Sequence, residues 1–164
     1  NYFGTCIRTF NVFFGGKLKD TIVTMECPNN KDKYFSVELI GVKTKKKASK
    51  NKLEVTLDIT GNGSIAEIYC DYNLEKIKTI NTLEKNLEKH ITNEIKNSIQ
   101  SLNNKYQSDI YDFKELFYKT NPKFYNIIKK DYYDKYFNNI KIKINTDIKL
   151  IEKGTITKVI KDEE

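Results

Sequence analysis

The chain has 164 residues, a formal net charge of +7, and 11 Tyr and 9 Phe but no Trp. Its length is typical of one domain and allows a sizeable core. Arg8 is the only arginine, so lysine carries nearly all of the positive charge. Because proteins that recognise bases use arginine for bidentate contacts, this composition argues against base recognition. No apolar run approaches the ~20 residues that a membrane-spanning helix requires.

Three cysteines, Cys6, Cys27 and Cys70, are widely spaced, and no C-x-x-C pattern occurs. Their odd number and their spacing argue against a disulfide framework and against a structural zinc site. One pair could still form a disulfide bond in an oxidising compartment. Because the first residue is Asn rather than Met, we expect a fragment of a longer protein, from which a targeting segment can have been removed.

The N-terminal half of the chain follows the two-residue period of β-strands. Phe10, Val12 and Phe14 occupy every second position, and a second alternation covers 22–27. Residues 34–72 then predict a three-stranded antiparallel meander with one polar surface. Its strands are expected at 34–42, 53–59 and 65–72, joined by a lysine-rich loop at 43–52 and a glycine turn at 60–64.

After residue 73 the apolar residues recur every three or four positions, and near the C-terminus the period returns to two. The first predicted helix is long and has a narrow apolar stripe, so we expect it to lie across the sheet. Asp109 can cap the second helix, and Pro122 can open the third at its first turn. The three helices and the closing strand are expected at about 78–106, 110–119, 122–137 and 139–151.

This order of strands, helices and a final strand indicates an α+β fold. We expect an antiparallel or mixed sheet of four to five strands, with one long helix packed across it and two short helices. Residues 20–164 should form this domain. Residues 1–19 are expected to be either a remnant of a preceding region or an edge strand.

Catalytic, metal-binding and cofactor-binding patterns are missing from the sequence. The single histidine, His90, adjoins the apolar stripe of the long helix at a position expected to face solvent. The densest carboxylates are Asp109, Asp112, Glu115, Asp131 and Asp134. Their spacing does not match a calcium-binding EF-hand, so we expect them to act as helix caps and ion-pair partners. We therefore expect no enzyme activity, no metal site and no cofactor.

The lysine-rich stretch 43–52 contains six lysines in ten residues. It can be interpreted as the solvated end of a hairpin or as a contact with anionic lipid. Single-stranded nucleic acid would also require aromatic side chains on the same surface, and this stretch has none.

Residues 106–139 hold 11 of the 20 aromatic side chains of the chain. Three hypotheses can explain so many rings in one helical stretch. They can form a core, a ligand platform or a docking face for a partner.

The same region carries motifs with a recognisable order. Ser108–Phe113 matches the pattern S-D-hydrophobic-x-x-F, and Leu116–Pro122 ends in x-P after a short apolar and basic run. An alternating strand then closes at Gly154, and the meander with its lysine-rich loop precedes the long helix. In this order the motifs resemble the C-terminal domain of the spore germination receptor C-subunit lipoproteins of the Ger(x)C type. The resemblance covers residues from about 20 to 156.

Three features depart from the family pattern. Tyr133 stands where the family has tryptophan, four residues before Phe137, and Lys114 stands where a glycine is common. Residues 1–19 match poorly. These differences are typical of a distant member.

The resemblance implies a non-catalytic lipoprotein subunit on the outer face of the spore inner membrane. Such subunits act with an integral-membrane A subunit and a transporter-like B subunit to sense nutrient germinants. The lipid anchor would lie N-terminal to this fragment, and none of its three cysteines matches the lipidated one. Cofactors and nucleic acid have no place in this role. The alternative is a generic extracytoplasmic domain that binds a ligand or nucleic acid.

The family motifs supply candidates for core or partner-face positions, namely Asp109, Phe113, Tyr118, Pro122, Tyr133 and Phe137. In the place of the family tryptophan, Tyr133 is expected to be largely buried, together with the phenylalanines around it. Tyr111, Tyr125 and Tyr132 are expected to lie outside the core, where tyrosine suits a protein interface.

Overall fold

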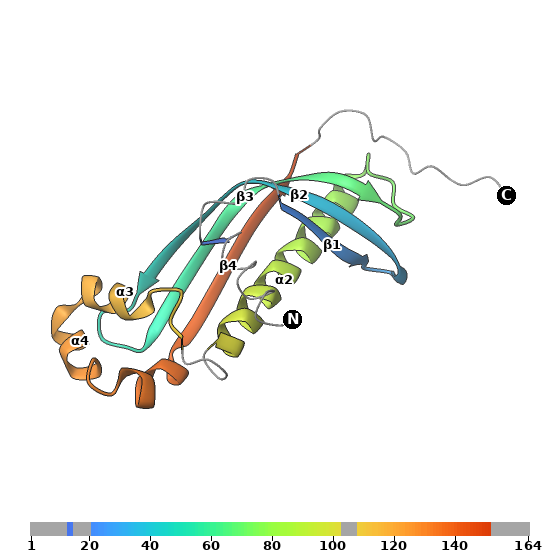
Figure 1. The fold of residues 1–164 in the computed structure, drawn as a ribbon. Helices are drawn as coiled ribbons and strands as arrows, with labels where there is room; N and C mark the ends of the chain where they lie inside the picture. Colours follow the sequence, from blue (N-terminus) through green and yellow to red (C-terminus); the bar gives the residue numbers. More distant parts are fainter. Residues whose placement is uncertain (1–12, 15–20, 103–107, 152–164) are drawn as a thin grey trace.

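The structure is a computed structural model that describes residues 13–14, 21–102 and 108–151 (Figure 1). Four strands form one sheet in chain order. They are β1 (Thr21–Cys27), β2 (Asn30–Ala48), β3 (Glu54–Ile68) and β4 (Lys141–Leu150). The helices are α2 (Ile77–Ser101), α3 (Phe113–Thr120), α4 (Pro122–Ile128), the π-helix η2 (Tyr132–Tyr136) and the 3-10 helix η3 (Phe137–Asn139).

The sheet is mixed. β1–β2 and β2–β3 are antiparallel pairs, whereas β4 runs parallel to β3. A parallel neighbour requires a long crossover connection, and the helices between β3 and β4 provide it. The predicted α+β class is therefore confirmed, with a mixed sheet of four strands, one long helix and shorter helices. The expectation for residues 1–19 lies almost wholly outside the described residues.

The long helix α2 packs its apolar stripe against the inner face of the sheet. Residues at intervals of four along this stripe are fully buried, namely Leu83, Leu87, Ile91 and Ile95. They belong to the same core as the inward side chains of β3, Val55, Leu57 and Ile59. Burying one such side chain stabilises a fold by roughly 1.5–3 kcal/mol, so this stripe fixes the helix on the sheet. The helix ends at Ser101, and the rest of its expected range falls largely outside the described residues.

The predicted three-stranded meander is wrong, because β2 and β3 are two long strands that continue through the expected loop and turn. Residues 43–48 belong to β2, where the exposed Lys43, Lys45 and Lys47 alternate with half-buried residues, of which Lys46 is one. Residues 60–64 belong to β3. A Cβ atom at Gly63 would lie 2.6 Å from Val37 Cγ1, so this glycine permits close approach of side chains within the sheet. It does not form a hairpin turn.

The third predicted helix is also wrong in its extent, because α4 stops at Ile128 and is followed by η2 and η3. In η2 the backbone N–H of Phe137 donates to the carbonyl of Tyr132, five residues earlier. This wider turn brings the two rings to the same side, with centroids 5.5 Å apart. In an α-helix, residues five apart such as Tyr132 and Phe137 would not lie on one face. The π-turn places them on the same face, so both rings enter the core.

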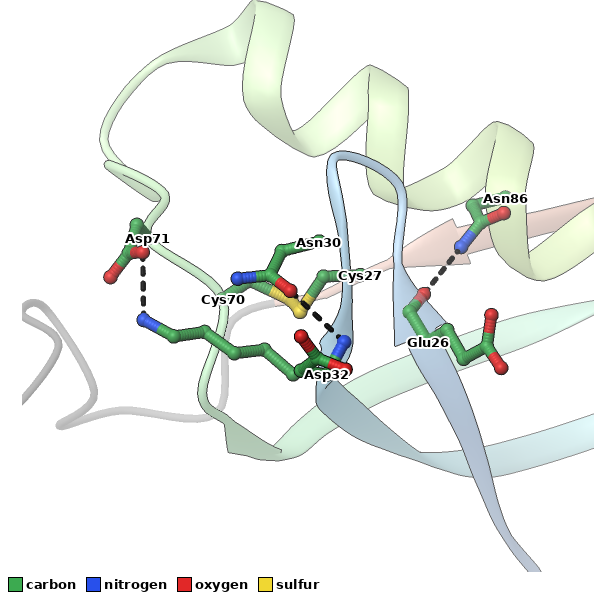
Figure 2. Close-up of a disulfide and its surroundings, with 8 residues drawn as sticks. Glu26, Cys27, Asn30, Asp32, Cys70, Asp71 and Asn86 are labelled. Atoms are coloured by element: carbon green, nitrogen blue, oxygen red, sulfur yellow. Dashed lines mark hydrogen bonds and ion pairs between the residues drawn. A yellow bond between two sulfur atoms is a disulfide. The ribbon is translucent and has the colours of Figure 1, made fainter.

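A disulfide bond joins Cys27, at the end of β1, to Cys70, just after β3 (Figure 2). The Cα atoms are 5.7 Å apart, and both side chains are buried. The sequence left open that one pair of cysteines could form a disulfide bond but did not indicate which pair. An ion pair between Lys33 Nζ and Asp71 Oδ2, at 2.7 Å, lies beside it.

Helices that could cross a membrane are absent from the part of the chain that the structure describes.

Candidate functional site

Residues 108–139, which we call the aromatic segment, form a small helical cap at one end of the long β2–β3 pair (Figure 1). Asn121 holds the corner between α3 and α4, where its side-chain oxygen accepts hydrogen bonds from the backbone N–H groups of Lys123 and Phe124. Its amide nitrogen donates to the carbonyl of Lys50 at 2.8 Å, in the turn between β2 and β3. The Asn121 side chain therefore caps the start of α4 and also connects the helical cap to the sheet. Pro122 follows at the first position of α4.

Asp109 joins the two halves of the cap. Its carboxylate accepts hydrogen bonds from the backbone N–H groups of Phe113 at 3.0 Å and Lys114 at 2.7 Å, at the start of α3. It also accepts one from the Tyr132 hydroxyl at 3.0 Å. The prediction that Asp109 caps the second helix is confirmed, although that helix starts three residues later than expected.

The interior of the cap is built from rings. Fully buried aromatic side chains of this segment are Tyr111, Phe113, Phe117, Tyr132 and Phe137. The Tyr111 hydroxyl and Ser98 Oγ on α2 are hydrogen-bonded at 2.8 Å. The core hypothesis therefore accounts for about half of the aromatic residues in this segment, and the cap is continuous with the main core.

The expected positions of two neighbouring tyrosines are reversed. Tyr133 is 38% exposed, whereas Tyr132 is 1% exposed. A buried tyrosine requires a hydrogen-bond partner for its hydroxyl, and the Asp109 carboxylate provides one for Tyr132. Burial, followed by the negative charge of Asp109, raises the pKa of Tyr132 well above its usual value. Tyr111 was also expected outside and is buried, because Ser98 satisfies its hydroxyl.

Above these buried rings lies an open cleft of about 310 Å³. Its wall carries carboxylates, one lysine and tyrosine rings from α3, α4, η2 and the turn before α3. The lining residues are Asp109, Asp112, Lys114, Glu115, Tyr118, Tyr125 and Tyr133. We call the surface formed by Tyr118, Tyr125 and Tyr133 the tyrosine cleft.

Lys114 and Glu115 of the cleft have partners within it or at its rim. The Lys114 ammonium lies 5.1 Å from the centre of the Tyr133 ring and 5.4 Å from that of Tyr132, within the range of a cation–π contact. Glu115 forms an ion pair with Lys119 at 2.7 Å, one helical turn later. Hydrogen bonding to Lys119 lowers the pKa of Glu115. The cleft is therefore a polar and aromatic surface.

Asp112 has a left-handed backbone conformation, with φ of 57°. Among the described residues other than glycine it alone has a positive φ. Its place directly before Phe113 lets the chain turn sharply into α3, so that Asp109 reaches back to the helix start. A residue other than glycine in this conformation is held by its surroundings, which here are the Asp109 hydrogen bonds.

Catalytic chemistry does not follow from this arrangement. His90 lies on α2, where Nε2 is 3.7 Å from Glu94 Oε1, and it is not part of the cleft lining. Within the described ranges, no group of three His, Cys, Asp or Glu residues could hold a metal ion. The cleft offers hydrogen-bonding and ring contacts, which suit binding.

The residues predicted from the family motifs divide into three groups. Asp109, Tyr118 and Tyr133 line the cleft, Phe113 and Phe137 lie beneath it, and Pro122 is exposed at the start of α4. Lys114 was not predicted to be part of this surface. Lys114 directly follows the buried Phe113 on a short helix, and this position could have indicated that its side chain lies at the surface.

Comparison with known proteins assigns the fold and the family. The family model described as "Spore germination B3/GerAC like, C-terminal" matches residues 8–154. A solved structure, the crystal structure of the GerBC protein, is similar with a TM-score of 0.71 and 16% identity. The similarity covers 90% of this chain and 45% of the GerBC chain, so this chain spans less than half of that protein. No curated protein sequence matches the chain.

Proposed function

We propose that this chain, which belongs to the family of spore germination B3/GerAC-like C-terminal domains, is a non-catalytic domain of the C subunit of a nutrient germinant receptor. The family match and the similarity of the fold to GerBC support this role. The domain acts through contacts with other proteins, namely the integral-membrane A subunit and the transporter-like B subunit.

The observation that carries the binding role is the tyrosine cleft. Tyr118 is 53% exposed and Tyr133 38% exposed, although both adjoin a well-packed core. Tyrosine is enriched at protein interfaces, because its large rigid ring buries apolar area and its hydroxyl forms hydrogen bonds. The Tyr118 and Tyr125 rings lie in edge contact, with centroids 5.3 Å apart, so the surface is ordered before a partner binds. We infer that a receptor subunit contacts this cleft.

The Cys27–Cys70 disulfide supports a location outside the cytoplasm, since such bonds form and persist in oxidising compartments. This agrees with a lipoprotein held on the outer face of the spore inner membrane by an anchor N-terminal to this chain.

The test is co-purification of the full-length lipoprotein from spores with the A and B subunits. The variant Tyr118→Ala/Tyr133→Ala removes the two most exposed rings of the tyrosine cleft. Its matched control, Tyr34→Ala/Tyr69→Ala, removes two exposed tyrosines in contact on the sheet, with ring centroids 4.6 Å apart. Interface hot spots cost about 2 kcal/mol or more, so recovery of a subunit should fall at least tenfold with the first variant only.

The two parts of this proposal fail in different ways. Native lipoprotein that is recovered without either membrane subunit, in spores that contain both, would contradict the receptor role. Equal recovery with the cleft variant and the control would leave the receptor role intact and would exclude the tyrosine cleft as the contact surface.

A further inference from the structure

The outer edge of β4 carries hydrogen-bonding groups that its parallel neighbour cannot use. In a parallel pair, successive residues direct their backbone groups alternately to one side and the other. Lys141 N donates to the carbonyl of Leu53, and Ile151 N donates to that of Gly63, so odd-numbered residues of this strand face β3. Even-numbered residues therefore present their N–H and C=O groups to the outer edge.

α2 closes only one half of that edge. Ile148 N donates to Glu88 Oε1 at 3.3 Å, and Leu150 N donates to Glu84 Oε1 at 2.9 Å, so two helix side chains satisfy the C-terminal half. The N–H groups of Ile142 and Ile144 have no such acceptor among the described residues. In that described part of the chain no strand lies beyond β4. An edge strand with open donors and acceptors is a template for one more strand.

A groove of about 280 Å³ with a mixed polar and apolar lining lies next to the open half of the edge, between α2 and β4. Four isoleucines, Ile99, Ile140, Ile142 and Ile144, form its apolar part, and Lys96, Gln100 and Asn138 form its polar part. Ile142 and Ile144 remain half-buried, whereas Ile148 farther along the same strand is fully buried. A strand added at this edge would turn every second side chain into the groove and cover the exposed parts of these two isoleucines.

The exposed lysines on the outer face of β4 indicate which charge the outward side chains of an added strand should carry. Lys141 and Lys143 are exposed and alternate with the two isoleucines, and Lys96 stands at the groove. Neighbouring strands place side chains of the same face side by side, and opposite charges in such pairs are favourable. The outward side chains of an added strand would therefore be acidic.

We propose that the 142–146 edge of β4 binds an extended segment of a partner protein in which apolar and acidic residues alternate. The backbone of that segment adds a fifth strand, its apolar side chains enter the groove, and its carboxylates meet Lys141 and Lys143. This mode of recognition combines backbone affinity with side-chain specificity. The inference concerns a different surface from the tyrosine cleft and does not rest on the proposed function.

The probe is a synthetic eight-residue peptide with alternating Glu and Val, added to the 164-residue chain. Two control peptides contain the same residues in two blocks, or Lys in place of Glu. Binding is measured by calorimetry, and amide hydrogen exchange is followed by NMR. We expect the alternating peptide to bind and to slow exchange of the Ile142, Ile144 and Thr146 amides, while exchange of the β1 amides is unchanged.

Charge reversal tests the lysines. Lys141→Glu/Lys143→Glu should weaken binding of the Glu–Val peptide at least roughly tenfold and should bind the Lys–Val peptide instead. The matched control, Lys43→Glu/Lys45→Glu, makes the same charge change at exposed lysines on β2, two strands away. That control should retain binding of the Glu–Val peptide.

Several outcomes would overturn the proposal. These are absence of binding, equal binding of the block peptide, protection at the β1 edge, and equal weakening by both double variants. Protection of the Ile142 and Ile144 amides that rises with protein concentration without peptide would assign the edge to a second copy of this chain. Circular dichroism of each variant confirms that a loss of binding is not a loss of fold.

Discussion

The two ends of the long sheet are closed by different physical means. At one end the Cys27–Cys70 disulfide connects β1 to the segment after β3, with the Lys33–Asp71 ion pair beside it. At the other end packed rings and the hydrogen bond between Asp109 and Tyr132 hold the helical cap. The first end depends on the redox state of its surroundings and the second on side-chain packing. The same fold therefore has two points of failure that respond to different perturbations.

The largest effect is expected from Phe137→Ala, at the cap. Phe137 is 1% exposed and contacts Tyr132 and Tyr133, so truncation leaves a cavity beneath the cleft. Such a change typically lowers the free energy of unfolding by about 3–5 kcal/mol. Urea unfolding followed by circular dichroism measures it.

Tyr133→Ala is the control for this prediction, because Tyr133 occupies the neighbouring surface and is 38% exposed. Its cost should stay below that of Phe137→Ala by at least about 2 kcal/mol. A similar loss for both variants would show that the cap lacks the buried core described above.

The disulfide end should give the next largest effect. Removing a cross-link that spans a sequence separation of 43 residues lowers the free energy of unfolding by about 2–4 kcal/mol. We expect this loss for Cys27→Ala/Cys70→Ala, and a similar loss when the native protein is placed in a reducing agent. The double variant should not respond to the reducing agent, and a native protein that is equally insensitive would contradict a stabilising bridge.

The contrast between the ends also shows what the sequence could predict. Period and composition correctly indicated the long helix, the short helices after it and the α+β class, because these depend on local patterns. The cysteine pair could not be deduced, because it depends on the register of three strands. Tyr34 pairs with Glu26 on one side, and its carbonyl accepts the N–H of Tyr69 on the other. Glu26, Tyr34 and Tyr69 therefore lie side by side across the sheet. This alignment brings together Cys27, which follows Glu26, and Cys70, which follows Tyr69.

The errors within the cap have an equally specific cause. Tyr132 and Tyr133 are adjacent and chemically identical, so periodicity alone could not decide which one is buried. The π-turn and the reach of Asp109 decide it, and both arise from tertiary packing. The lysine-rich stretch was assigned to a loop by composition, although every second side chain from 43 to 48 continues the strand pattern. Tertiary context overrides composition at such positions.

A smaller effect is expected from Tyr132→Phe, which keeps the ring and removes the hydroxyl that binds Asp109. Hydrogen bonds to charged groups contribute about 1.5–3 kcal/mol, so the free energy of unfolding should fall by an amount in this range. Tyr133→Phe changes the same group on an exposed neighbour and should cost nothing measurable. Equal stability of native protein and Tyr132→Phe would mean that ring packing alone closes this end.

The smallest effect concerns alkaline pH and again separates the two ends. Burial and the Asp109 carboxylate raise the pKa of Tyr132 above the usual value of 10.0. Above pH 10 the unfolded chain therefore releases a proton that the native protein retains, and the free energy of unfolding falls as the pH rises. The contribution of this one group is about 1.4 kcal/mol per pH unit, present in full below pH 10 and lost progressively above it.

Urea unfolding of native protein and Tyr132→Phe from about pH 9 to about pH 11 isolates the contribution of Tyr132, because all other tyrosines and lysines titrate in both proteins. The stability difference between the two should shrink by about 1 kcal/mol over this range, whereas the loss caused by Cys27→Ala/Cys70→Ala should stay constant, since a disulfide does not titrate. A difference between native protein and Tyr132→Phe that is independent of pH would contradict a native Tyr132 that keeps its proton.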